Sequence, residues 1–263
     1  MYKLFISPHL DDIIFSLGNY INSISKKSNI IIATVFTKEN KEKLKNMKGE
    51  LFTYGNYQKR IEEDKNAMKK LDNVKVIYFN LEDKIFRENV SNIKLELEIS
   101  YNINKILKKY EIKDIYLPLG IGYHNDHILV NNSIYHLNLH DYNINYYYDY
   151  PYCNNELNLI SRLSDYGIFK ENLNLKMIKN YYNDPIYSSL NFFVKTIKVS
   201  YLVIRYSFNF IFRQFKNQYE ITNYRIDSNL KLNLMKNYDS QIIPIFGNLD
   251  NLKRLLKIND NEK

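Results

Sequence analysis

Residues 30–36 read Ile30-Ile31-Ile32-Ala33-Thr34-Val35-Phe36 (IIIATVF), and this run decides the predicted fold. A continuous apolar strand of this length is typical of a parallel sheet, whose central strands are covered by helices on both faces. Shorter β-rich runs occur before and after it along the chain. These further predicted strands are Tyr2–Ser7, Val74–Phe79, Ile112–Leu117 and Ile144–Tyr148.

Segments with apolar residues at helical spacing separate the strands. They are Ile13–Lys26, Tyr57–Lys70 and Asn92–Tyr110. In the last segment we expect a core-facing stripe made of Ile93, Leu97, Tyr101, Ile103, Ile106, Leu107 and Tyr110. Because strands alternate with helices, the sequence predicts an α/β fold with a Rossmann-like, mostly parallel sheet and helices on both faces.

The second half of the chain is predicted to be largely helical. Helical patterns cover Glu156–Leu163, Asp227–Tyr238 and Asn248–Ile258. We therefore expect a single domain of residues 1–263. Residues 1–150 would form the sheet and carry the functional site, and residues 151–263 would form a helical C-terminal part.

Residues 188–216 combine basic and apolar side chains. On a helix, the basic residues fall along one stripe, while Phe, Ile, Val, Leu and Tyr cover most of the remaining surface. The basic residues are Lys195, Lys198, Arg205, Arg213 and Lys216. Such a helix packs against its own domain, contacts a second copy as a dimer, or lies on an anionic membrane, and the sequence leaves these three alternatives open.

Composition excludes several classes of protein. The chain has 263 residues, of which 45% are hydrophobic, so it has enough apolar content for a sizeable core. Its single cysteine, Cys153, excludes an internal disulfide and a Cys₄ zinc module. The net charge of +8 comes from a compositional bias spread along the whole chain, and we therefore expect no specific nucleic-acid binding.

The sequence also bears on location in the cell. The N-terminus, MYKLFISPHLDD, has too short an apolar run for a signal peptide. The sequence contains no run of about 18 uncharged apolar residues, so we expect no transmembrane helix. We expect a cytoplasmic protein. Peripheral binding to the inner face of the membrane through residues 188–216 is a further expectation.

Two polar clusters follow the ends of predicted strands. Ser7-Pro8-His9-Leu10-Asp11-Asp12 comes directly after the first strand, and Gly122-Tyr123-His124-Asn125-Asp126-His127 follows the strand that ends near Leu117. The carboxyl ends of parallel strands meet at one edge of a sheet, where open α/β sheets bind their ligands. Three of the five histidines are therefore predicted to lie at this edge.

The residue types in these clusters fit a metal-dependent hydrolase. Catalytic zinc takes three imidazole or carboxylate ligands and keeps one position for water. His9 and Asp12 are three residues apart, and a histidine of the second cluster completes a His₂Asp set. Asp11 can then deprotonate water and His124 can protonate a leaving amine, while Asp126 orients a neighbouring histidine.

At these residues the sequence resembles the PIG-L/LmbE-type zinc-dependent N-acetylglucosaminyl deacetylases, whose motifs include P-H-L-D-D and H-x-D-H. Further segments resemble family motifs in the same order along roughly residues 3–241. They are Arg60–Asp64 (R-x-x-E-D), Asp83–Arg87 (D-x-x-F-R), Tyr148–Tyr152 and Lys236–Gln241.

The resemblance implies roles for individual residues. The implied metal ligands are His9, Asp12 and His127. The implied catalytic residues are Asp11 as general base and His124 as electrophile and general acid, held by Asp126.

The resemblance also implies sugar contacts at Arg60 and Asp83. An ion pair between Arg60 and Asp64 on the helix surface, and a turn cap at Asp83, are the structural alternatives. The role of Tyr123 is left open.

We therefore expect a zinc-dependent N-deacetylase, an amidohydrolase that acts on a linear amide C–N bond. Its substrate would be an N-acetylglucosamine-type amino sugar on a larger conjugate. One Zn²⁺ per chain is the expected cofactor, with Fe²⁺ as the alternative, because a His₂Asp site binds several divalent ions. The rival function is that of a catalytically silent relative that binds sugars or forms complexes. A nucleotide-binding Rossmann domain lacks support, since no G-x-G-x-x-G motif follows a strand.

Overall fold

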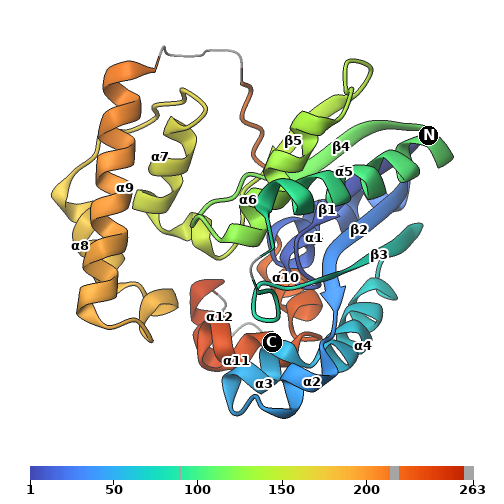
Figure 1. Cartoon of the computed structure of the whole chain (residues 1–263), viewed down its shortest axis with the longest axis horizontal. Coiled ribbons are helices and arrows are strands. Elements are labelled where there is room, and N and C mark those ends of the chain that lie inside the picture. Colours follow the sequence, from blue (N-terminus) through green and yellow to red (C-terminus); the bar gives the residue numbers. More distant parts are fainter. Residues whose placement is uncertain (89, 214–218, 258–263) are drawn as a thin grey trace. The chain divides into compact units, whose positions relative to one another are not determined.

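Five strands that all run parallel form one sheet (Figure 1). The computed structural model describes residues 1–88, 90–213 and 219–257. The strands are β1 (Tyr2–Ser7), β2 (Asn29–Lys38), β3 (Val74–Glu82), β4 (Ile112–Pro118) and β5 (Asn143–Tyr147). Their order is β3-β2-β1-β4-β5, so the winding reverses between β1 and β4. Ligand sites of such sheets lie at this reversal, beyond the carboxyl ends of the strands.

Both faces of the sheet are covered, and the predicted Rossmann-like α/β fold is confirmed. The run Ile30–Phe36 in β2 is buried along its whole length. On one face, Phe5 of β1 contacts the ring of Tyr20 in α1 (Asp12–Ser25). On the other face, β-strand side chains pack with those of α5 (Asn92–Lys109) and α6 (Asn125–Ser133).

Helix α5 corrects one sequence-based prediction. Ile103 and Ile106 are buried as expected, together with Leu95 and Ile99. Three residues that were predicted to face the core are instead 51–63% exposed, namely Ile93, Leu97 and Tyr101. The seven predicted residues spread over more than half of the helix circumference at 100° per residue, and only one side of a helix can face a sheet.

The chain divides into two compact units, and its last helices belong to the first. The first unit comprises Met1–Pro118, Asn125–Tyr147 and the described residues from Arg225 to Lys257. Phe15 of α1 packs against Tyr238 and Phe246, which anchors the C-terminal segment to the sheet layer. The helices of this segment are α10 (Ser228–Met235), α11 (Asp239–Phe246) and α12 (Leu249–Leu255). Ile258, the last residue of a predicted helix, lies outside the described residues.

Shorter elements complete the first unit. Three helices connect β2 to β3: α2 (Lys41–Lys45), α3 (Glu50–Gly55) and α4 (Tyr57–Met68). A 3₁₀ turn, η1 (Ile134–His136), follows α6.

The second unit comprises Leu119–His124 and Tyr148–Tyr224, and it is helical as predicted for this part of the chain. Its main helices are α7 (Glu156–Ser164), α8 (Leu175–Asn183) and α9 (Phe192–Phe212). Two 3₁₀ turns accompany them, η2 (Tyr152–Asn154) and η3 (Pro185–Tyr187). Buried side chains from all three helices form a separate core, including Leu157, Met177 and Leu202. Lys216 of the predicted basic stripe lies outside the described residues. Among the helices described, none has the length and apolarity needed to cross a membrane.

Candidate metal centre

The loop after β1 turns back on itself and carries three of the predicted site residues. The hydroxyl of Ser7 donates to the carbonyl of His9 at 2.5 Å and accepts from the N–H of Ile13 at 3.2 Å. The carboxylate of Asp12, the first residue of α1, accepts from the N–H of His9 at 2.8 Å. These bonds place the side chains of His9 and Asp12 around one point.

Helix α6 brings Asp126 and His127 of the second cluster to the same edge of the sheet. Its first turn contains Asp126 and His127, both of which are buried. The side-chain amide of Asn131 donates to the carbonyl of Pro118 at 2.7 Å, and this bond ties the helix to the end of β4. The neighbouring strands β1 and β4 therefore deliver His9, Asp12 and His127 to a common site.

His9, Asp12 and His127 form a buried group that fits a divalent cation. Oδ2 of Asp12 lies 3.0 Å from Nδ1 of His9 and 3.2 Å from Nε2 of His127. One ligand atom from each residue lies within 4.8 Å of the other two. Ligands at about 2.0–2.2 Å from a tetrahedral ion are separated by about 3.3 Å, so the two distances from Asp12 are close to the spacing of a zinc-type site.

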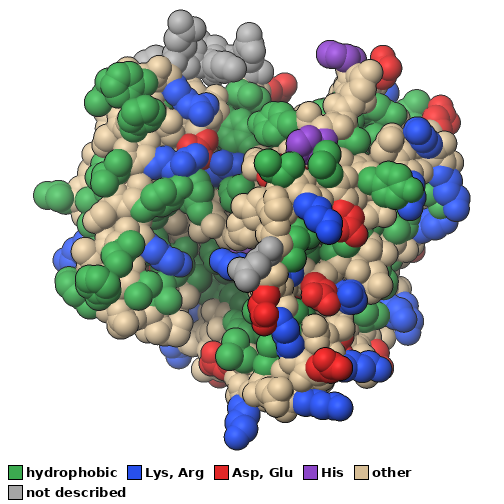
Figure 2. Space-filling model, viewed as in Figure 1, with side chains coloured by type: hydrophobic (Ala, Val, Ile, Leu, Met, Phe, Trp, Pro, Cys, Tyr) green, Lys and Arg blue, Asp and Glu red, His purple; other side chains and the backbone are tan. Residues whose placement is uncertain are grey.

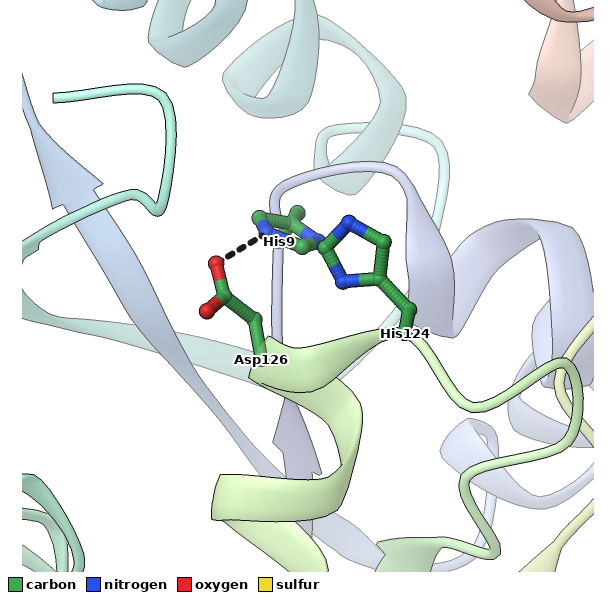
Figure 3. Close-up of side chains that lie close together, drawn as sticks. All are labelled: His9, His124 and Asp126. Atoms are coloured by element: carbon green, nitrogen blue, oxygen red, sulfur yellow. Dashed lines mark hydrogen bonds and ion pairs between the residues drawn. The ribbon is translucent and has the colours of Figure 1, made fainter. Parts of the chain in front are cut away.

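Asp126 holds the ring of His9 from the opposite side to Asp12. Nε2 of His9 lies 3.2 Å from Oδ2 of Asp126, as the dashed line in Figure 3 shows. The same carboxylate accepts from the N–H of Lys84 at 3.2 Å and pairs with Arg87, whose guanidinium lies 4.7 Å from the centre of the Phe36 ring. A carboxylate on the second ring nitrogen is the usual way to orient a metal-binding histidine.

Asp11 lies beside this group and has a different partner. Its Oδ1 accepts from Nη2 of Arg60 at 3.0 Å, and both side chains are buried. Arg60 also donates to the carbonyl of Tyr54 at 3.1 Å and lies 4.7 Å from the centre of the Tyr57 ring. The alternative of a surface pair with Asp64 is not what the structure shows, since Asp64 instead accepts from two tyrosine hydroxyls at 2.7 and 2.8 Å.

The two adjacent carboxylates have pKa values displaced in opposite directions. Burial raises the pKa of Asp11, as does the neighbouring charge of Asp12, while Arg60 and His9 act against this rise. Burial also disfavours ionised Asp12, but the rings of His127 and His9 outweigh it and hold the pKa of Asp12 well below its usual range. One carboxylate is therefore suited to remain an anionic ligand, and the other to take up a proton.

Asp83 combines a structural contact with a position near His9. Its Oδ1 accepts from the N–H of Ile85 at 3.1 Å, which is the turn cap considered from the sequence. Its Oδ2 accepts from the hydroxyl of Tyr57 at 2.5 Å and lies 3.4 Å from Nε2 of His9. The sugar contacts implied for Asp83 and Arg60 stay predictions.

Sequence reasoning assigned no role to Tyr57 or Arg87. Arg87 lies in the segment Asp83–Arg87 that resembles a family motif. A buried arginine needs a carboxylate partner, so this position could have indicated a pair with a carboxylate of the site, which is Asp126. Tyr57 gave no such signal, because tyrosine is abundant throughout this chain.

His124 ends the loop of residues 119–124, one residue before α6, and Figure 3 draws its side chain. Within the second unit the backbone of this loop is anchored at several points. Asp149 accepts from the N–H groups of Gly120 and Ile121 at 2.7 and 2.8 Å, and Arg162 donates to the carbonyl of Leu119 at 2.7 Å. The loop that carries His124 is thus held by buried polar groups. The role of His124 as electrophile and general acid stays a prediction, and so does its orientation by Asp126.

Two residues of this loop have left-handed backbone conformations. Gly122 has a φ of +85°, and a Cβ added there would lie 2.9 Å from the ring of Tyr152. Tyr123 has a φ of 55°, and its hydroxyl donates to Asp165 at 3.0 Å. The observed contact of Tyr123 is therefore with the buried polar network of the second unit.

A family model and several solved structures are similar to this chain. The PIG-L model, described as GlcNAc-PI de-N-acetylase, matches residues 4–157. No curated protein matches the chain. The structure of the A40926 pseudoaglycone deacetylase Dbv21 is similar with a TM-score of 0.55 and 16% identity, over 91% of this chain and 82% of that chain.

A deacetylase from the biosynthesis pathway of teicoplanin is also similar. Its complex with bog has a TM-score of 0.50 and 18% identity, over 79% of this chain and 84% of that chain. Its complex with teicoplanin has a TM-score of 0.50 and 17% identity, over 79% and 87% of the two chains. At such identities, these similarities show a shared fold.

Proposed function

We propose that this chain, which belongs to the PIG-L family of GlcNAc-PI de-N-acetylases, is a metal-dependent hydrolase. The proposed reaction removes the N-acetyl group from an N-acetylglucosamine-type amino sugar on a larger conjugate. The observation that carries the proposal is the buried group of His9, Asp12 and His127 with Asp11 beside it. The deacetylases of similar fold support the same reaction class.

His9, Asp12 and His127 are the proposed metal ligands, for Zn²⁺ or Fe²⁺. A divalent ion bound there supplies Lewis acidity, which polarises the amide carbonyl and makes water more acidic. Asp126 and Asp12 hold the two ring nitrogens of His9, so this imidazole is oriented before any ligand arrives.

Asp11 is the proposed general base. Its Oδ1 is engaged by Arg60, so Oδ2 is the atom that takes the proton from the attacking water. The raised pKa of Asp11 increases its proton affinity, and the Arg60 charge limits this rise.

His124 is the proposed general acid. The water oxygen bonds to the acetyl carbon, the C–N bond breaks, and the amine nitrogen takes a proton from the His124 ring. The products are acetate and a free amino sugar. Asp149 and Arg162 anchor the backbone of the loop that carries this ring, at Gly120 and Leu119.

Acetate release from a panel of N-acetylglucosamine conjugates tests this function. The panel contains a lipid-linked sugar, a nucleotide sugar, a thiol-sugar precursor, an antibiotic glycoside and a polysaccharide unit. We expect acetate and free amine in equal amounts from at least one conjugate, and at least about a hundredfold slower release of both from the Asp11→Asn variant. A metal-loaded protein that binds a conjugate tightly without releasing acetate would support the rival, a catalytically silent relative.

A further inference from the structure

One face of α9 is apolar and exposed. The side chains on this face, here called the outer stripe, are 46–72% exposed, and they are Phe193, Ile197, Tyr201, Ile204, Phe208, Ile211 and Phe212. Another face of the same helix is buried in the core of the second unit, through residues that include Val199, Leu202 and Tyr206. Helix α9 therefore has one apolar face for its own unit and a second that contacts solvent.

The outer stripe is continuous. At 100° per residue its seven side chains fall within an arc of about 100°, and at 1.5 Å per residue it extends for about 28 Å along the helix. No charged residue interrupts it. Contiguous exposed apolar surface on this scale marks a site of interaction with another protein or a membrane.

The borders of the stripe identify the chemistry of the partner. Lys198 and Arg205 lie along one border, where Arg205 also pairs with Asp165 at 2.7 Å. Ser200 and Ser207 lie along the other border, and α9 contains no Asp or Glu. Figure 2 shows hydrophobic and basic side chains gathered over this helix, on the left of the view. An apolar strip edged by cations is complementary to a surface with anionic headgroups above hydrocarbon.

We propose that the outer stripe docks the protein on an anionic lipid bilayer, with α9 lying in the plane of the interface. The inner face of the helix is buried in the core of the second unit, so the outer stripe is the apolar face that remains for the bilayer. The basic border then lies at the level of the lipid phosphates.

A second copy of the chain fits this surface less well. An antiparallel α9–α9 pair with two-fold symmetry would place the Lys198 and Arg205 borders of both helices along the same edge. Each Arg205 already pairs with Asp165 of its own chain at 2.7 Å, and the partner α9 offers no acidic residue opposite Lys198. Lipid phosphates would add negative charge on the Lys198 side of the stripe, which a second α9 does not.

Sedimentation of the full chain with lipid vesicles tests the docking surface. The vesicles contain phosphatidylglycerol mixed with phosphatidylcholine, or phosphatidylcholine alone. We expect binding to the mixed vesicles that weakens with added salt. We also expect the double variant Ile204→Asp with Phe208→Asp to weaken it by about tenfold or more, because two apolar side chains lose their burial in the acyl region.

A matched control uses the equivalent pair on another exposed helix face. Ile93→Asp with Leu97→Asp on α5 changes two exposed apolar residues at the same spacing and should leave vesicle binding unchanged. Lys198→Glu should weaken binding to the anionic vesicles only. Equal loss of binding in the α5 control would overturn the proposal. The proposal would also be overturned if the wild-type protein bound neither kind of vesicle. The same holds if the wild-type protein formed a dimer that the α9 double variant dissociates.

Discussion

Nη2 of Arg60 lies 3.0 Å from Oδ1 of Asp11, and both side chains are buried although they are 49 residues apart in the chain. Asp11 follows β1, while Arg60 lies on α4. The adjacent residue Asp12 contacts two imidazole rings instead. Two neighbouring carboxylates thus have different partners, and this difference separates the proposed base from the proposed ligand.

Replacing Arg60 should change the pH dependence of turnover. The Arg60 charge lowers the pKa of Asp11, so Arg60→Gln should raise this pKa. A base acts only when it is deprotonated, and the rising acid limb of the kcat/KM profile should therefore move to higher pH. Arg60→Lys keeps the charge and should shift the limb less. An unshifted limb with lower activity at every pH would show that Arg60 contributes only to structure.

Removing the proposed base should separate metal binding from catalysis. Asp11→Asn keeps the shape of the side chain but removes its ability to take up a proton. We expect turnover to fall by about 10²–10⁴-fold with metal content unchanged. Turnover and metal content measured on the same preparation check this outcome, and full activity of the variant would contradict the assigned base.

Loss of a ligand should remove the metal. His127→Ala deletes one of three proposed donors, and we expect metal retained after dialysis to fall to background, as measured by elemental analysis. His136→Ala is the control, because His136 is an exposed histidine that pairs with Glu96 at 3.3 Å. Equal metal retention by both variants would exclude His127 as a ligand.

Gly122→Ala should disturb the loop that carries His124. The new Cβ would lie 2.9 Å from the Tyr152 ring at a φ of +85°, so the loop must shift. We expect turnover to fall by at least about tenfold while metal is retained. Gly49→Ala is a matched control, since Gly49 also has a positive φ but no atom within 4 Å of the added Cβ. If Gly49→Ala lost as much turnover as Gly122→Ala, the effect would come from general destabilisation and not from the loop that carries His124.

Asp64 should make stability depend on pH. Burial raises its pKa from 3.8 to about 7, while hydrogen bonds from Tyr78 and Tyr238 act in the opposite direction. The folded protein then holds a proton that the unfolded chain releases, so the contribution of Asp64 to the free energy of unfolding is largest below pH 3.8 and is lost as the pH rises to about 7.

The measurement is the free energy of unfolding of wild type minus that of Asp64→Asn, followed across this pH range by denaturant titration. The subtraction removes the contributions of other titrating groups. We expect the difference to decline as pH rises. A difference that stays constant would mean that Asp64 is ionised in the folded protein.

The sheet was predictable because a continuous apolar sequence indicates a strand that is buried on both faces. The continuous apolar run Ile30–Phe36 is typical of a strand covered on both faces, and it is one. The histidine clusters follow β1 and β4, which are neighbours at the reversal of winding. Sequence alone therefore brought His9 and His127 to the same edge of the sheet. It did not show which nitrogen of His9 faces Asp12, since that depends on the turn held by Ser7.

Other features depend on contacts between distant segments, and local patterns carry little information about them. The pairing of Arg60 with Asp11 depends on where α4 packs. The sequence offered Asp64, four residues after Arg60 on the same helix, as the local alternative partner. The exposure of Ile93 on α5 reflects the choice of one helix face among several apolar positions. The return of α10 to α1 was not foreseen, since nothing in residues 228–235 specifies their neighbour.

Restoration of activity by metal is the measurement that tests the central claim most directly. The full chain is stripped with a chelator, reloaded with Zn²⁺ or Fe²⁺, and assayed for acetate release and bound metal together. We expect one ion per chain and acetate release only after reloading, with neither in Asp12→Ala. Undiminished acetate release by the stripped protein, or a wild-type chain that retains no ion after reloading, would contradict the account.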